Sequence, residues 1–173
     1  MPECVECHPG AKTSKKPGDN LLPAQEVCLK CHHAVVPAPV VVRVVHFSHA
    51  THARVGNVAS VIAAAIDAGK YLEPPGGLRK ALDTRNPCLG CHRGIETSEK
   101  VTRANLPRMA DCLVCHAEIS PPDSCTKCHG DDAALKPASH TADFIDTHTS
   151  SAAVGKTGCA VCHGRTFTCQ GCH

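Results

Sequence analysis

Apolar side chains repeat at helical spacing in one stretch of this chain, from about residue 53 to residue 66. The residues that follow the 3.6-residue period of an α-helix are Val55, Val58, Ala59, Ile62, Ala65 and Ile66. Gly69 is suited to cap the C-terminus of such a helix, and Pro74 prevents it from continuing. The pattern therefore predicts one amphipathic helix whose apolar face needs a surface to pack against.

The other elements that the pattern predicts are short. The β-branched run at residues 40–45 follows two prolines and predicts a strand or an extended segment. Residues 11–20 predict an exposed loop and residues 73–77 a turn. Short helical turns are expected in residues 77–84 and 140–148. The predicted fold class is thus mostly irregular, with a few short α-helices and little β structure.

Composition changes this picture, because the chain lacks the side chains of an ordinary protein core. Its 173 residues include no Trp, one Tyr and three Phe, whereas large aromatic side chains usually dominate a core. The length suits a single unit over residues 1–173, with lobes at 1–75 and 76–173 as the alternative division. No apolar run of 18 residues is present, so no transmembrane segment is expected.

The fourteen cysteines all fall in seven copies of the pentapeptide Cys-x-x-Cys-His. Structural zinc or a disulfide framework would account for the cysteines but not for a histidine after every second one. The pentapeptide is the attachment site of c-type haem, with thioethers from both cysteines and a proximal histidine on the iron. The motifs, numbered in chain order, are motif 1 (Cys4, Cys7, His8), motif 2 (Cys28, Cys31, His32), motif 3 (Cys88, Cys91, His92), motif 4 (Cys112, Cys115, His116), motif 5 (Cys125, Cys128, His129), motif 6 (Cys159, Cys162, His163) and motif 7 (Cys169, Cys172, His173).

Seven covalently attached haem c groups would supply the apolar bulk that the side chains lack. The core is then expected to be mostly cofactor, and the apoprotein is not expected to fold alone. The apolar face of the predicted helix would pack on a porphyrin or on a neighbouring copy of the chain. The formal charge is +2 with 18 Lys and Arg, which we interpret as partners of the haem propionates. No basic run with interleaved aromatics predicts binding to nucleic acid.

Six histidines lie outside the motifs and are candidates for the distal side of the irons. They are His33, His46, His49, His52, His140 and His148. Seven irons and six histidines leave one iron without a histidine of this set. Met109 is the candidate for that position, although a methionine that fills a gap beside a porphyrin would look the same in sequence.

Two short stretches resemble the cytochrome c3 and c7 families. Phe47-Ser48-His49-Ala50-Thr51-His52 is similar to the FxHxxH element of those families, and Cys31-His32-His33 to their CHH. The resemblance implies that His49, His52 and His33 are distal ligands, whereas His46, His140 and His148 depend on the count alone. The chain departs from those families because its next motif after FxHxxH begins only at residue 88. Its dense, aromatic-poor composition also resembles, in architecture only, extracellular cytochromes that stack into filaments.

Irons with an imidazole on both faces exchange electrons with little rearrangement and are closed to substrates. We therefore expect an electron-transfer protein, not an enzyme, acting as a carrier or as a polymeric wire of copies of itself. A reductase that uses one open-coordinate haem on a small substrate is the alternative. Because c-type haem is attached outside the cytoplasmic membrane, the expected location is periplasmic or extracellular, with redox proteins as partners. No leader is visible before motif 1, so we interpret the chain as a mature form.

Overall fold

The computed structural model describes residues 3–17, 19, 21–33, 44–116, 125–130, 135, 140–147 and 156–163. These residues form short helices joined by irregular segments, and none of them forms a strand. The fold class predicted from the pattern is confirmed to that extent. Val44 makes an isolated antiparallel bridge with His129; most of the predicted strand, residues 40–43, lies outside the described residues.

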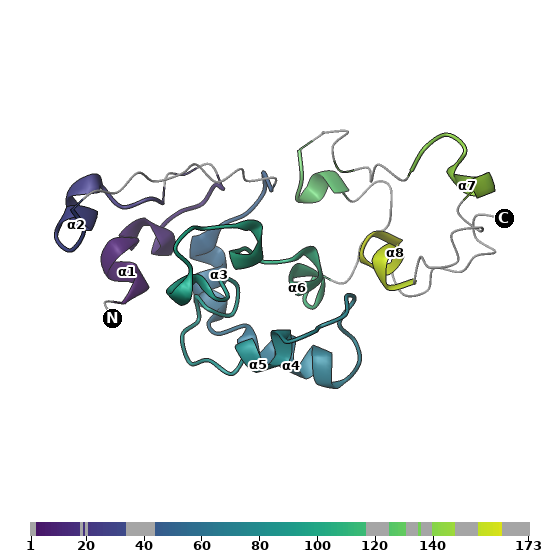
Figure 1. The fold of residues 1–173 in the computed structure, drawn as a ribbon, viewed down its shortest axis with the longest axis horizontal. Coiled ribbons are helices and arrows are strands. Elements are labelled where there is room, and N and C mark those ends of the chain that lie inside the picture. Colours follow the sequence, from purple (N-terminus) through teal and green to yellow (C-terminus); the bar gives the residue numbers. More distant parts are fainter. Residues whose placement is uncertain are drawn as a thin grey trace.

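The elements follow one another along the long axis of the molecule, with α1 and α2 towards one end and α7 and α8 towards the other (Figure 1). In chain order they are α1 (Cys4–Cys7), η1 (Pro9–Lys12), α2 (Gln25–Leu29), α3 (His49–Val55), α4 (Ala59–Asp67), α5 (Leu78–Ala81), η2 (Ile95–Thr97), η3 (Arg103–Asn105), α6 (Met109–Leu113), η4 (Cys125–Lys127), α7 (Phe144–Thr147) and α8 (Lys156–His163). None of the described helices is long and apolar enough to cross a membrane.

The helix predicted from residue 53 is in fact divided between α3 and α4. Gly56 has a φ of 89°, which only glycine adopts readily, and it ends α3. Asn57 then accepts a hydrogen bond from the backbone nitrogen of Ala59 at 3.0 Å and donates one to the carbonyl of Thr84 at 2.8 Å. The side chain of Asn57 therefore starts α4 and ties it to the segment after α5.

The predicted end of the helix at Gly69 is confirmed. Gly69 has a φ of 65°, and its backbone nitrogen donates to the carbonyl of Ile66 at 2.9 Å. The nitrogen of Lys70 donates to the carbonyl of Ala65 at 2.7 Å. These two nested hydrogen bonds form the Schellman motif, which satisfies carbonyl groups that the end of a helix would otherwise leave unpaired.

One hydrophobic cluster holds α4, α5 and α6 together. Its buried members are Ala59, Ile62, Ala63, Tyr71, Leu78, Leu82 and Ala110, with Val58, Ile66, Leu72 and Val114 packed against them. Ala59, Ile62 and Ala63 of the helix are thus covered by the same chain, whereas Val55 and Val61 are exposed; packing on a porphyrin or a neighbouring copy stays a prediction. The cluster includes residues from both sides of residue 75.

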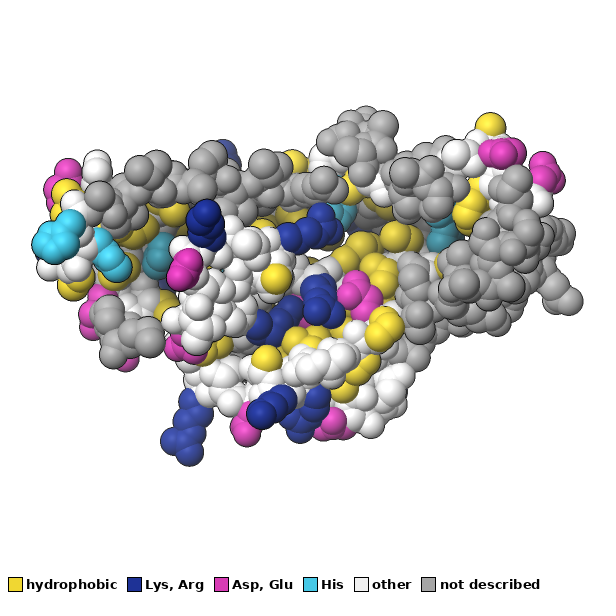
Figure 2. Space-filling view, viewed as in Figure 1, with side chains coloured by type: hydrophobic (Ala, Val, Ile, Leu, Met, Phe, Trp, Pro, Cys, Tyr) yellow, Lys and Arg dark blue, Asp and Glu magenta, His cyan; other side chains and the backbone are white. Residues whose placement is uncertain are grey.

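The described residues bury few large side chains. No large side chain among the described residues is fully buried, and Leu22, Leu29, Val45, Val55, Val61 and Val101 are exposed. Hydrophobic side chains lie open on the face shown in Figure 2. Among the described residues, several large apolar side chains are therefore left open to solvent.

Two neighbouring residues of α4 test this description of the core. Ile62 is 2% exposed and Val61 is 45% exposed. We expect Ile62→Ala to lower the free energy of unfolding by about 2–5 kcal/mol and Val61→Ala to change it by less than about 0.5 kcal/mol. Urea unfolding of the intact protein, followed by circular dichroism, measures both; equal effects would contradict the core assignment.

Candidate metal centres

Six of the seven motifs lie in the described residues; all but motif 3, which forms a turn, overlap a short helix. In motifs 1 to 5 the backbone nitrogen of the histidine donates to the carbonyl of the first cysteine, at 2.8–3.0 Å. Motif 6 lies inside α8. Because side chains three residues apart share a helix face, the two thiols of each motif are placed to hold one edge of the same group. Motif 7 and His148 lie outside the described residues.

Three motif histidines each face a histidine from elsewhere in the chain. The ring centroids of His49 and His92 are 6.3 Å apart, with an angle of 12° between the ring planes. Those of His140 and His163 are 6.2 Å apart at 4°. Those of His52 and His116 are 6.3 Å apart at 50°. In every pair, one ring is a candidate proximal ligand and the other a candidate distal ligand.

This separation suits a metal ion held between the two rings. A metal–imidazole bond is about 2.0 Å long, so two such bonds in line place the ring centroids about 6.3 Å apart. A haem iron needs two axial ligands from the protein, since the porphyrin supplies the other four. The residues present therefore fit a haem c group: two thiols on one helical face, an adjacent imidazole, and a second imidazole opposite.

Hydrogen bonds orient three of the imidazoles for this role. Nδ1 of His8 lies 2.6 Å from the carbonyl oxygen of Leu21, and Nδ1 of His52 lies 2.8 Å from that of Ser48. Nδ1 of His92 lies 3.1 Å from that of Asn105. A ring that donates from Nδ1 keeps Nε2 free as a metal ligand, and such contacts fix the orientation of ligating histidines.

His49 differs, because its Nδ1 is buried without a hydrogen-bond partner among the described residues. Burial lowers the pKa of His49, and the charges of His92 and His52 lower it further. Burial also lowers the pKa of His92, although the hydrogen bond to the Asn105 backbone acts in the opposite direction. Both rings are therefore favoured in the neutral form, which is the form that binds metal. A buried polar ring without a protein partner indicates that another group completes this site.

The twelve described cysteines are all free thiols. Burial, followed by the charges of Asp111, Cys91 and Cys128, raises the pKa of Cys112 to about 11. Burial likewise raises the pKa of Cys91. These two thiols are therefore favoured in the protonated form at neutral pH. Within the described ranges, no three His, Cys, Asp or Glu side chains converge as a metal cluster.

The described motifs lie next to one another in an order that differs from the sequence. Burial, and then the charge of Cys4 in motif 1, raise the pKa of Cys88 in motif 3. Cys112 of motif 4 lies within electrostatic reach of motifs 3 and 5. Burial, and then the charge of Cys125 in motif 5, raise the pKa of Cys162 in motif 6. Motifs 1, 3, 4, 5 and 6 therefore form a row.

Motif 2 lies at the end of this row beside motif 1. A cavity of about 290 Å³ is lined by Cys7 of motif 1 and by Val27 of α2, which directly precedes motif 2. Its other lining residues are Glu6, Pro9, Gly10, Leu21, Leu22, Pro23 and Ala24. In Figure 1 the helices that carry motifs 2, 1, 4 and 6 follow one another along the long axis in the same order.

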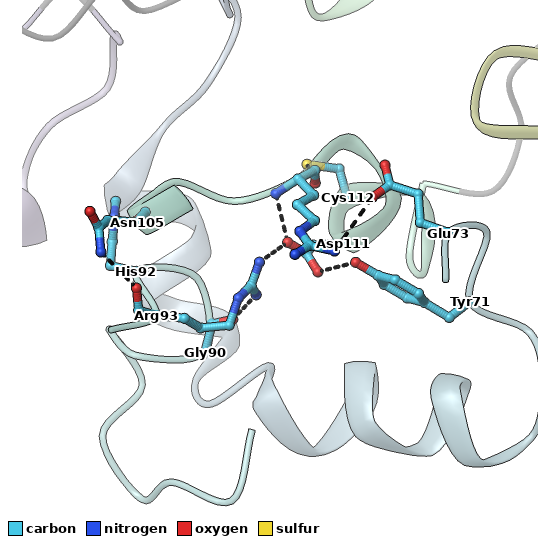
Figure 3. Close-up of polar contacts among 9 residues, drawn as sticks. Tyr71, Glu73, Gly90, His92, Arg93, Asn105, Asp111 and Cys112 are labelled. Carbon is cyan, nitrogen blue, oxygen red and sulfur yellow. Dashed lines mark hydrogen bonds and ion pairs between the residues drawn. The ribbon is translucent and has the colours of Figure 1, made fainter. Parts of the chain in front are cut away.

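A buried carboxylate joins motif 3 to motif 4 (Figure 3). Asp111 directly precedes motif 4 and pairs with Arg93, which directly follows motif 3. Asp111 also accepts a hydrogen bond from the hydroxyl of Tyr71 at 2.9 Å and one from the backbone nitrogen of Arg108 at 2.7 Å. Burial, and then the charge of Asp111, raise the pKa of Tyr71. The spacing of the two motifs thus depends on one anion and its donors.

Motif 3 is also fixed by two close contacts. Gly90 lies so near Ala59 that a Cβ would come within 3.2 Å of the backbone nitrogen of Ala59. Buried Asn105 donates to the carbonyl of Arg93 at 3.0 Å and to the hydroxyl of Ser98 at 2.9 Å. These contacts hold motif 3 against α4 and place the Asn105 carbonyl beside His92.

The remaining candidates for distal ligands are not among the three histidine pairs. His33 and His46 are exposed, and the backbone nitrogen of His46 donates to the carbonyl of Cys128 in motif 5 at 3.2 Å. Met109 begins α6, half-buried, three residues before motif 4. The assignments of these residues as ligands stay predictions.

Reasoning from sequence missed the residues that support the ligands. Phe47 and Phe144 pack on candidate distal histidines, while Arg93 and Asp111 tie two motifs together. A signal was present, since opposite charges directly follow motif 3 and directly precede motif 4, and each phenylalanine lies within four residues of a non-motif histidine.

None of the protein-family models, curated proteins or solved structures compared with this chain matches it.

Two aspartates test the role of the buried ion pair. The side chains of Arg93 and Asp111 are 8% and 3% exposed, whereas those of Arg79 and Asp67 are 47% and 56% exposed. We expect Asp111→Asn to destabilise the intact protein by about 3–5 kcal/mol, because the Arg93 guanidinium loses its counter-charge. Asp67→Asn should have little effect. Denaturant unfolding measures the free energy of unfolding of both variants. If Asp111→Asn left that free energy unchanged, the ion pair would not hold the two motifs together.

Proposed function

We propose that this chain transfers electrons along a row of seven covalently attached haem c groups, most of them with a histidine on each face of the iron. The observation that carries the proposal is the set of three imidazole pairs with centroids 6.2–6.3 Å apart. Each pair joins a motif histidine to a histidine from another part of the chain. Packing of aromatic rings alone gives no reason for that combination to occur three times at one separation.

The pairs assign distal ligands to three of the proposed haems. His49 serves motif 3, His52 serves motif 4 and His140 serves motif 6. His33, His46 and His148, with Met109 as the candidate for the last position, are proposed for the remaining irons. An iron with an imidazole on both faces has no open position and keeps the same ligands in both oxidation states. The proposed activity is therefore electron transfer without turnover of a substrate.

The row of motifs supports transfer from one centre to the next. Thiols of neighbouring motifs lie within electrostatic reach of each other along motifs 1, 3, 4, 5 and 6, and a cavity is lined both by Cys7 of motif 1 and by Val27, which directly precedes motif 2. Groups tethered at such neighbouring points would form a continuous path along the long axis. Electrons would then enter or leave near either end of the row through transient contacts with redox proteins or further copies of the chain.

The proposed location is periplasmic or extracellular, where c-type haem is attached. The chemistry of attachment is tested directly by the mass of the native protein. We expect an increase equal to seven haem groups that survives denaturation, together with the absorption spectrum of low-spin haem. Unmodified cysteines or bound zinc in the native protein would refute the proposed function.

Replacing one distal candidate should open one iron. We expect His49→Ala to convert about one haem in seven from low spin to high spin, because His92 would remain as the single axial ligand. Arg54→Ala, an exposed change in the same helix, is the control and should leave every haem low-spin. Electron paramagnetic resonance of the oxidised protein counts the high-spin iron. If His49→Ala produced no high-spin iron, or high-spin iron in several haems, the pairing of His49 with His92 would be contradicted.

A further inference from the structure

We propose that Phe47 sets the ring planes of two axial ligands and thereby makes the haem of motif 4 electronically distinct from its neighbours. This inference rests on the proposed function, because it concerns irons held by His52 and His116 and by His49 and His92. It assigns a positioning role to a residue that is not itself a ligand. Figure 1 shows α3, whose start follows Phe47, near the middle of the described elements.

Phe47 contacts both histidines of α3, each in a different way. Its ring stacks on that of His52, with centroids 4.4 Å apart and 18° between the planes. The same ring meets His49 edge to face, at 4.7 Å and 85°. One phenylalanine cannot lie parallel to both rings, so the planes of the two histidines are steeply inclined to each other. Aromatic contacts of these two kinds are favourable and directional.

The ring of His52 is fixed on a second side by a hydrogen bond. Its Nδ1 lies 2.8 Å from the carbonyl oxygen of Ser48. Ser48 caps α3, since its hydroxyl oxygen accepts a hydrogen bond from the backbone nitrogen of Thr51 at 3.2 Å. Face contact with Phe47 and the edge contact with Ser48 together oppose rotation of the His52 ring. The ring cannot turn to match its partner without breaking one of them.

The result is visible in the angles between paired rings. His49 and His92 are nearly parallel at 12°, and His140 and His163 at 4°. His52 and His116 are twisted by 50°. Phe144 stacks on His140 at 4.6 Å and 8°, so stacking by itself does not produce a twist. The twisted pair is the one whose His52 ring is held both by the face of Phe47 and by the carbonyl of Ser48.

The angle between two axial imidazoles changes the electronic structure of the iron. Parallel rings donate to the same iron d orbital and split it from its partner orbital, whereas twisted rings share their donation between the two orbitals. A smaller splitting raises the largest g value of low-spin ferric iron. Contacts that orient a ligand thus tune the metal without touching it. The haem of motif 4 should therefore give a separate low-spin signal.

The test is electron paramagnetic resonance of the oxidised, fully loaded protein and of three variants. We expect the wild-type protein to show a low-spin signal at larger g from the haem of motif 4, besides the signals of the two parallel pairs. Phe47→Leu removes the ring and should move that signal towards the parallel class, whereas Phe47→Tyr keeps the ring and should preserve it. Phe144→Leu, the matched loss of a ring from another distal histidine, should leave it unchanged.

Haem content by mass is measured for each sample, which separates this inference from the proposed function. A protein without covalent haem refutes both. A loaded wild-type protein without the separate signal overturns this inference alone, as does a loaded Phe47→Leu variant that keeps it or a Phe47→Tyr variant that loses it. If Phe47→Leu does not load haem, the wild-type and Phe47→Tyr spectra still decide the question.

Discussion

The buried carboxylate of Asp111 is the interaction on which the arrangement of the described motifs depends most. It is bound by the Arg93 guanidinium, the Tyr71 hydroxyl and the Arg108 backbone nitrogen. An unpaired charge at that depth would be strongly unfavourable, so the three donors must stay together. Arg93 continues motif 3, Asp111 introduces motif 4, and Tyr71 belongs to the hydrophobic cluster with α4. One anion therefore connects two candidate metal centres to the only sizeable core in the described part of the chain.

That core is small, and its limits explain the rest of the molecule. It packs Ile62 and its neighbours against Leu78, Leu82 and Ala110, while residues near the other motifs remain open to solvent. Short helices of four or five residues do not persist by backbone hydrogen bonding alone. Three of them, α1, α2 and α6, overlap motifs 1, 2 and 4, where a tethered ring system would bury the exposed thiols, imidazoles and apolar side chains. The proposed cofactors would then complete a scaffold that the polypeptide provides.

The sequence predicted some features well because their causes are local. Gly69 and the apolar spacing around Ile62 predict the end and the buried face of α4. The break at Gly56 was missed, since an apolar period continues across it and only the positive φ interrupts the backbone. The pairing of His49 with His92 and of Asp111 with Arg93 was also beyond prediction. Both depend on how distant segments meet, which spacing along the chain does not determine.

The two imidazoles of α3 have a consequence for how the protein matures. His49 and His52 lie on one short helix but face motifs that follow much later in the chain. If the chain is exported from its N-terminus and takes up haem as proposed, motifs 1 and 2 would acquire their irons before His92 and His116, the partners of the α3 histidines, have emerged. The imidazoles of α3, like other free imidazoles nearby, could then bind an iron that is not their partner in the native structure. Such local binding is faster than the closure of the long loops that the native pairs require. Late exchange of axial ligands, and not collapse of the chain, should limit the rate at which the native form appears.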